Sequence, residues 1–292
     1  MHKLQWDDLS DAARNAIEAR CGAVLKAESA ERGIMPGVAA RLDTECRESA
    51  FLKAIPRDGP AVRLHLRERA ANLGMADGVP APPMLWSGEA GGWLLLLFHF
   101  VDGGRSADLS PGSRDLPGVL DAVSRIEGSG GVLPPVSVNL EMLKKTAAAF
   151  LAEGLGGSRR GTYAEALDAL PWAALEGDEL LHYDLHSGNL LATGRETFVI
   201  DWSFACRGAR WVDAALLAPR LVEAGHTPAR AEALVAGLPT WDAAPAEAVT
   251  GLAALWTMFR EYKALYGPRE HRGFRTRAAE AGWAWLRHLA RW

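Results

Sequence analysis

The chain has 292 residues, of which 49% are hydrophobic and 23% are charged, and its net charge is −4. This length is sufficient for two compact lobes, each with its own core. The composition is that of a folded globular protein, and it argues against a disordered chain or a basic protein that binds nucleic acid.

The cysteine content and the apolar runs predict where the protein resides. Cys21, Cys46 and Cys206 are far apart and lack the spacing of metal ligands, which favours unpaired thiols in a reducing compartment. The longest apolar run, 93–98, is too short to span a bilayer. The N-terminal residues lack an apolar signal core. We therefore expect a cytoplasmic protein with no membrane partner, which is a monomer or a weak dimer.

The first part of the chain predicts a small lobe that combines strands with helices. A helix is expected over 8–23. Strand-like runs at 38–42 and 49–55 flank a charged connection, which is typical of an antiparallel pair. A helical pattern over 62–75 is followed by two strands within 84–100, which meet at a Gly-Gly turn.

Most of the remaining chain has helical periodicity and contains no internal repeat. The expected helices lie at 116–127, 138–155, 162–175, 212–224, 228–236, 245–266 and 275–288. The change in pattern near Val101 predicts a lobe boundary there. Residues 1–100 form one domain in this interpretation and residues 101–292 form the other.

The stretch "LLHYDLHSGN", residues 180–189, gathers polar side chains within apolar sequence. Buried polar groups are costly unless they have partners, so such a cluster indicates a function or a set of specific contacts. Two apolar runs follow it, separated by a Gly-containing turn, which is a hairpin pattern. With the turn centred on Arg195, Asn189 lies opposite Asp201 at a side-chain separation of roughly 5 Å.

These facing residues predict a metal site. The amide oxygen of Asn189 and the carboxylate of Asp201 are hard ligands of the kind that Mg²⁺ accepts while it keeps water and phosphate oxygens. Asp184 lies five residues before Asn189 and is a candidate base for an attacking hydroxyl.

His182, Asp184, Asn189 and the later "IDW" resemble the H-x-D-x-x-x-x-N and metal-aspartate motifs of the protein-kinase-like fold. The closest variant is the aminoglycoside phosphotransferase family, whose loop is typically "DLHPGN" where this chain reads "DLHSGN". The resemblance implies an α+β, protein-kinase-like bilobal fold, with a small mixed β-sheet N-lobe that binds nucleotide. A larger, mostly helical C-lobe would carry the catalytic loop and the substrate site.

The same template requires a strand lysine that holds the phosphates and a helix carboxylate that orients this lysine. Lys53 lies within the apolar run "AFLKAI", where a charge without an anionic partner would be costly. Glu68 falls on the apolar stripe of its predicted helix. Each residue supplies what the other lacks, so we expect them to pair.

Further roles follow from the resemblance. A phosphate-covering loop falls at Gly33 to Gly37, between the first helix and the first expected strand, although Pro36 removes one N–H donor. The backbone of Phe98, His99, Phe100 and Val101 should contact adenine.

Two residues are expected to support the catalytic loop. His182 should pack beneath the loop and bind backbone. Asp213 resembles the aspartate that braces the loop, although capping of the following helix explains it equally well. Tyr183 departs from the glycine or arginine that the family usually has at this position.

The implied reaction transfers the γ-phosphoryl group of ATP or GTP, with Mg²⁺, to a hydroxyl of a small molecule. An aminoglycoside or another antibiotic is the first expectation, although the basic character of the last 42 residues weighs against a polycationic acceptor.

Other functions remain open. The acceptor can be another hydroxylated metabolite. His182, Asp184 and His186 would share one face of a strand and offer ligands to Zn²⁺ or Mn²⁺ in a metal-dependent hydrolase. A catalytically silent nucleotide-binding module is the third alternative.

Overall fold

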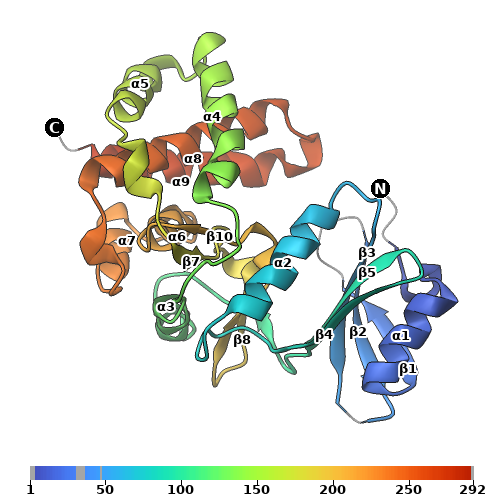
Figure 1. Ribbon diagram of the computed structural model, residues 1–292. Coiled ribbons are helices and arrows are strands. Elements are labelled where there is room, and N and C mark those ends of the chain that lie inside the picture. The colour runs from blue at the N-terminus through green and yellow to red at the C-terminus, as the bar shows by residue number, and fades with distance from the viewer. Residues whose placement is uncertain (1–3, 31–36, 47, 291–292) are drawn as a thin grey trace.

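The computed structural model describes residues 4–30, 37–46 and 48–290, and it has two lobes (Figure 1). The small lobe is an antiparallel five-stranded sheet with two helices, and the larger lobe is mostly helical. The predicted α+β, protein-kinase-like bilobal fold is confirmed. We propose residue 100 as the boundary between the lobes, because the last strand of the large sheet ends at His99.

The sheet of the small lobe has the strand order β1-β2-β3-β5-β4, with antiparallel neighbours throughout. Its elements are α1 (Asp11–Cys21), β1 (Val24–Ser29), β2 (Val38–Thr44), β3 (Ala50–Pro56), α2 (Val62–Gly74), β4 (Met84–Ala90) and β5 (Trp93–His99). Gly91 and Gly92 both have positive φ, as expected for the predicted two-residue turn between β4 and β5.

The uniformly apolar sequence of β5 follows from its position in the sheet. Leu95 and Leu97 pack with Ile17 of α1 on one face of the sheet. Leu94 and Leu96 pack on the other face, where α2 lies. A strand buried on both faces reads as a continuous apolar run, because neither set of alternating side chains meets water.

Strand β1 was not predicted, because only a helix over 8–23 is expected before the strand-like run at 38–42. The helix is shorter than expected and ends at Cys21, and β1 pairs with β2 at the edge of the sheet. The sequence of β1, "VLKAES", has several residues of low β-propensity, and its exposed side chains hide the usual alternation. The predicted glycine loop therefore falls between β1 and β2.

The large lobe is built around one extended core, to which all seven of its helices contribute. They are α3 (Leu116–Ser124), α4 (Val136–Ala152), α5 (Arg160–Asp168), α6 (Val212–Glu223), α7 (Pro228–Val235), α8 (Ala246–Tyr266) and α9 (Arg272–Leu289). Helix α6 is buried continuously from Val212 to Leu221. Each of these helices matches one of the predicted helical segments.

Short strands of the large lobe lie around the polar cluster at 180–189. They are β6 (Arg105–Ser106), β7 (Glu179–Leu181), β8 (Leu190–Ala192), β9 (Thr197–Val199) and β10 (Cys206–Gly208). They form a three-stranded sheet, β6-β8-β9, and a two-stranded sheet, β10-β7. Short 3₁₀ segments lie at Trp6–Asp8, Gly157–Arg159, Trp172–Leu175, Ser187–Asn189, Trp202–Phe204, Trp241–Ala243 and Arg269–His271.

The β8–β9 hairpin exists, but its predicted register was wrong by one residue. Leu190 pairs with Val199, and the turn consists of Gly194 and Arg195, with Gly194 at φ +84°. The centre of the turn therefore lies before Arg195, not on it. Asn189 is opposite Ile200, whose N–H donates to the Asn189 carbonyl at 2.9 Å. Asp201 follows at the next position.

Across the described residues, none of the helices has the length and apolar character needed to cross a membrane. The cytoplasmic location and the oligomeric state stay predictions.

We predict that Gly37→Ala destabilises the small lobe more than Gly78→Ala does. Both glycines have positive φ, at +135° and +102°, so alanine is strained at each, by about 1–3 kcal/mol. A Cβ at Gly37 would also lie 2.5 Å from the carbonyl oxygen of Ala54, whereas a Cβ at Gly78 meets no atom within 4 Å. Urea denaturation measures the difference, and equal losses of stability would contradict the close approach of Gly37 to β3.

Candidate active site

The catalytic-loop sequence is organised around the fully buried ring of His182. Its Nε2 lies 2.9 Å from the carbonyl oxygen of Ile200, and its Nδ1 accepts from the N–H of Asp184 at 3.3 Å. A carbonyl only accepts, so Nε2 carries the proton and Nδ1 is the acceptor. The ring also meets Trp202 edge to face, with centroids 4.8 Å apart. His182 thus holds the start of the loop against the segment that follows β9.

Asp213 binds the same loop from α6. Its carboxylate accepts from the N–H groups of His182 and Tyr183, at 2.7 Å each. Asp213 lies in the first turn of α6 but makes no cap there, so its oxygens serve the loop and not the helix. Tyr183 has φ +71°, an uncommon conformation for a residue other than glycine. The two charge-assisted hydrogen bonds hold this strained backbone in place.

The side chain of Asn189 closes the loop. Its Nδ2 donates to the carbonyl oxygen of Asp184 at 2.9 Å. The amide nitrogen is thereby used inside the loop, which leaves Oδ1 as the atom available to a ligand. Asp184 keeps a side chain that is 34% exposed, so a substrate can reach its carboxylate.

Lys53 joins the two lobes through a buried ion cluster. Its Nζ lies 2.7 and 2.9 Å from the two carboxylate oxygens of Glu68, and 3.0 Å from Oδ1 of Asp201. Glu68 also accepts from the N–H of Trp202 at 3.3 Å. The expected pairing of Lys53 with Glu68 is therefore present, and Asp201 lies in the same group.

The charges of the cluster shift one another's pKa values, although burial raises the pKa of Glu68. Burial by itself would lower the pKa of Lys53, but the carboxylates of Glu68 and Asp201 outweigh it and raise that pKa. For Asp201, the Lys53 ammonium outweighs burial and lowers the pKa of the carboxyl to about 2. Nearby, burial and the Lys53 charge lower the pKa of His65 to about 4, so this ring is neutral at neutral pH.

The predicted nucleotide loop and adenine segment are placed only in part. Gly33 lies outside the described residues. Gly37 begins the described part of the loop and lies against Ala54, the neighbour of Lys53 on β3. In the adenine segment, the N–H of His99 donates to Pro83 and that of Phe100 donates to Ser49.

Phe98 is only 7% exposed and is paired on both sides within the sheet. The N–H of Val101 has no hydrogen-bond partner among the described residues. Of the four expected residues, Val101 therefore offers the free donor.

Three basic side chains lie near Asp184: His186, which the sequence analysis considers only as a metal ligand, and Arg220 and Arg260, which it does not name. Nε2 of His186 lies 3.7 Å from one carboxylate oxygen, and the Arg220 guanidinium lies 3.8 Å from the other. Arg260 is close enough to Asp184 for the two charges to interact. Arg220 could have been identified from the sequence, because it interrupts the apolar run "ALLAPRLV" just as Lys53 interrupts β3.

The donor set fits Mg²⁺ and does not fit the hydrolase alternative. Oδ1 of Asn189 and the carboxylate of Asp201 are hard oxygen donors, which suits Mg²⁺. In the hydrolase interpretation, His182 would be a zinc ligand, but both of its ring nitrogens are used within the protein. No cluster of three His, Cys, Asp or Glu ligands occurs among the described residues.

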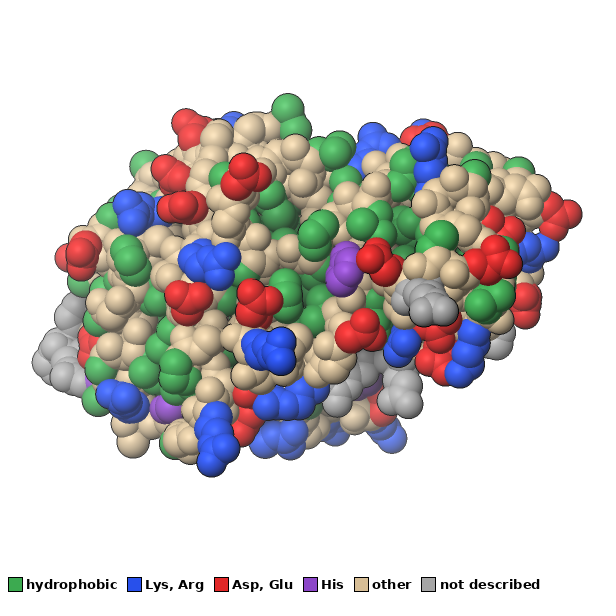
Figure 2. Space-filling view, turned by 90° about the horizontal axis from the view of Figure 1, so that it is seen from below, with side chains coloured by type: hydrophobic (Ala, Val, Ile, Leu, Met, Phe, Trp, Pro, Cys, Tyr) green, Lys and Arg blue, Asp and Glu red, His purple; other side chains and the backbone are tan. Residues whose placement is uncertain are grey.

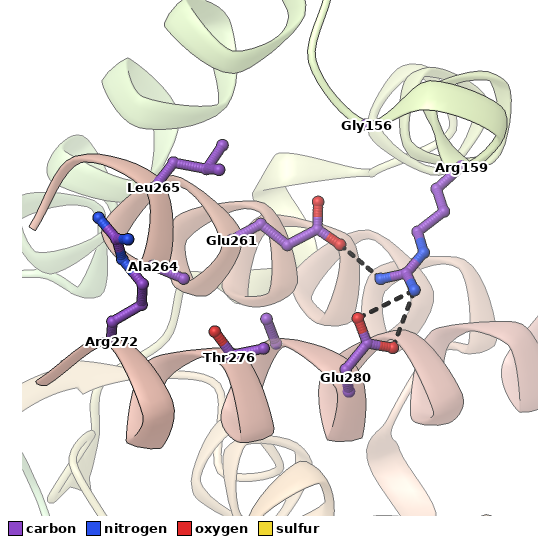
Figure 3. Close-up of a pocket in the computed structure, with 9 residues that line it drawn as sticks. Gly156, Arg159, Glu261, Ala264, Leu265, Arg272, Thr276 and Glu280 are labelled. Carbon is purple, nitrogen blue, oxygen red and sulfur yellow. Dashed lines mark hydrogen bonds and ion pairs between the residues drawn. The ribbon is translucent and has the colours of Figure 1, made fainter. Parts of the chain in front are cut away.

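A separate pocket of about 470 Å³ lies on the helical lobe, away from these residues (Figure 3). Arg159 points into it from the α4–α5 connection and is bound by Glu261 of α8 and Glu280 of α9. Neither Asp184 nor Lys53 lines this pocket.

A two-lobed fold with a lysine–glutamate pair and a braced H-x-D loop defines a protein-kinase-like phosphotransferase. The model of the phosphotransferase enzyme family matches residues 28–246, which is most of the chain. The chain therefore belongs to this family, whose members are small-molecule kinases. Among curated proteins, no relative matches the sequence significantly.

Several solved structures share the fold. An aminoglycoside phosphotransferase from Alicyclobacillus acidocaldarius has 15% identity and a TM-score of 0.64, with 97% of each chain covered. The choline kinase LicA from Streptococcus pneumoniae has 14% identity and a TM-score of 0.60, and the match covers 93% of this chain and 98% of LicA.

A thermostable mutant of the aminoglycoside phosphotransferase APH(4)-Ia, in complex with ADP and hygromycin B, has 15% identity and a TM-score of 0.58. That match covers 93% of this chain and 98% of the mutant. At such identities, these likenesses establish the fold.

We predict that Lys53→Met lowers the free energy of unfolding by about 3–5 kcal/mol, because it leaves the buried carboxylate of Glu68 without its ammonium. The double variant Lys53→Met/Glu68→Met should recover most of this loss, since it removes both charges. Urea denaturation of the two variants measures the effect. A double variant as unstable as the single one would show that the pair is not the cause.

Proposed function

We propose that this protein transfers the γ-phosphoryl group of ATP, or of GTP, to a hydroxyl group of a small molecule, and that the reaction depends on Mg²⁺. The observation that carries the proposal is the convergence on one region of the Lys53–Glu68–Asp201 cluster and the Asp184–Asn189 loop. The two are joined through Ile200, whose carbonyl binds His182 and whose N–H binds Asn189.

The residues of the small lobe bind and orient the nucleotide in this proposal. Lys53 holds the α- and β-phosphates, and Glu68 fixes the position of its ammonium. The glycine loop ending at Gly37 covers the phosphates, where the missing side chain allows backbone to approach. The N–H of Val101 donates to the adenine ring.

The residues of the large lobe act on the acceptor and the metal. Asp184 accepts a hydrogen bond from the attacking hydroxyl and aligns its oxygen with the phosphorus. His182 and Asp213 position this loop. Asn189 and Asp201 hold Mg²⁺, which neutralises charge on the phosphates when it is bound. Because the transition state of phosphoryl transfer is loose, alignment and charge outweigh proton removal.

The identity of the acceptor is the finer part of the proposal. Similar folds occur in a complex with hygromycin B and in a choline kinase, which supports a small hydroxylated acceptor. An aminoglycoside or another antibiotic remains a candidate, and another hydroxylated metabolite is the alternative. Aminoglycosides are polycations and favour an acidic surface. On the face shown in Figure 2, acidic side chains are interspersed with basic ones.

We predict that Asp184→Asn lowers the rate of phosphoryl transfer by about 10²–10⁴-fold, because the amide cannot accept the hydroxyl proton. Binding of the nucleotide should persist, since Asp184 does not contact it in the proposal. Transfer is read from the mass gain of acceptors in a panel, and nucleotide binding is measured by calorimetry. Asp178→Asn is the matched control, because this aspartate is 86% exposed. Equal transfer by Asp184→Asn and the control would refute the role of Asp184.

Removal of divalent cations should abolish tight nucleotide binding, and Mg²⁺ should restore it. Asp201→Asn should weaken the restoration strongly, because it removes the charged ligand but keeps a similar shape. Calorimetry with a non-hydrolysable ATP analogue, with and without a chelator, measures both effects. Nucleotide binding that does not depend on Mg²⁺ in either protein would contradict the assigned metal site.

A further inference from the structure

Helices α6 and α8 place two guanidinium groups beside the proposed catalytic aspartate. Arg220 of α6 and Arg260 of α8 both lie over the ring of Trp256, at 5.1 and 4.8 Å from its centroid. Trp256 is itself 6% exposed and belongs to the core of the large lobe. The two cations are therefore fixed by packing, and they adjoin the carboxylate that would align the acceptor.

Arg220 is a buried cation whose partners are incomplete. Only 6% of the residue is exposed, and its guanidinium lies 3.2 Å from Glu223 and 3.8 Å from Asp184. Its Nε is buried without a hydrogen-bond partner. Buried polar groups are satisfied in nearly all native structures, so this unused donor is available to a bound group.

Arg260 is less satisfied still. Its side chain has no hydrogen bond or ion pair to any residue that the structure describes, and its guanidinium lies over the rings of Trp256 and Phe259. Its Nε is buried and unpartnered as well. Burial and repulsion from Arg220 lower the pKa of Arg260 to about 9, so the guanidinium remains charged at neutral pH.

Around Arg260, positively charged side chains outnumber negatively charged ones. Arg220 and Arg275 repel it, and Asp184 and Glu223 attract it. Three guanidinium groups thus share two carboxylates, and one of these carboxylates would be engaged by the attacking hydroxyl. An added oxyanion would balance the remaining positive charge, whereas an added ammonium group would increase the imbalance.

Arg159, in the pocket of Figure 3, is an arginine whose charge is neutralised by carboxylates of the protein itself. Its guanidinium binds Glu261 at 2.8 Å and Glu280 at 2.8 and 3.0 Å (Figure 3). The neutralised Arg159 calls for no further anion. Arg260 lies next to Glu261 in the sequence of α8, and its side chain has no such partner among the described residues.

We propose that the acceptor of this enzyme carries an oxyanion, a carboxylate or a phosphate, in addition to the hydroxyl that is phosphorylated, and that Arg260 and Arg220 bind this group. The inference rests on the proposed function, because it assumes that Asp184 marks the acceptor site. Guanidinium groups suit such a ligand, since their planar donors match the oxygens of carboxylates and phosphates. The specificity then falls on hydroxylated acids and not on polycationic acceptors.

The test uses the full-length protein saturated with Mg²⁺ and a non-hydrolysable ATP analogue. Inorganic phosphate and malonate are titrated by calorimetry, as probes for the two kinds of oxyanion. The wild type should bind at least one of them at a single site, and Arg260→Met should weaken that binding by at least about 30-fold, as for loss of one partner of a buried charge pair. Arg260→Lys, which keeps the charge, should retain part of the affinity.

Arg277→Met is the matched control, because Arg277 is exposed on α9 and the substitution changes the same charge. It should bind the anions as the wild type does. Transfer to glycerate and to glycerol, which differ in a carboxylate, is compared in parallel, and the preference for glycerate should fall in Arg260→Met.

Two results would overturn the inference: a wild type that binds neither phosphate nor malonate, or equal anion affinity in Arg260→Met and Arg277→Met. Failure of the Mg²⁺-dependent nucleotide binding that precedes the titration would instead count against the proposed function. The comparison of the two arginine variants can still be made in that case.

Discussion

The proposed nucleotide site depends on the ammonium of Lys53. It brings together strand β3, helix α2 through Glu68, and the segment after β9 through Asp201. A charge in the interior costs several kcal/mol unless it is paired with good geometry, so each of these three elements constrains the position of the other two. The arrangement of the lobes and the arrangement of the phosphate-binding groups therefore follow from the same contact. A nucleotide would meet a site that is already assembled.

The proposed catalytic and metal-binding residues include or adjoin strained backbone that partly buried hydrogen bonds hold in place. Tyr183 and Asp201 are the residues other than glycine with positive φ in the described part of the chain. Such conformations cost about 1–3 kcal/mol each, and they persist where surrounding contacts fix them. Asp213 holds Tyr183, and Lys53 holds Asp201. The two strained positions adjoin or include the proposed catalytic and metal-binding groups, which is where strain is expected to collect.

The site residues that the sequence could identify are those whose charge would be costly to bury in the element predicted for them. The kinase template requires a lysine and a carboxylate that pair, and Lys53 and Glu68 fitted it because each interrupts an apolar pattern where an unpaired charge would be costly. The predicted β8–β9 register was wrong. The turn is centred half a residue before Arg195, which shifts every cross-strand pair. Periodicity alone does not fix the position of a turn. Strand β1 was missed because an exposed edge strand shows little alternation. Arg220 carried the same signal as Lys53, but Arg260 follows a mixed sequence, and only tertiary packing brings it to Asp184.

The leucine-rich strand β5 has a consequence for the chain before it is folded. In the native sheet it is an interior strand, flanked by β3 and β4 and covered by helices on both faces. In an extended chain the same residues are an uncharged apolar segment without proline, which is the kind that seeds aggregation. The helices that cover it, α1 and α2, both precede it in the sequence. The elements that conceal this segment are therefore already synthesised when it appears, and it stays exposed only until α1, α2 and β5 have docked.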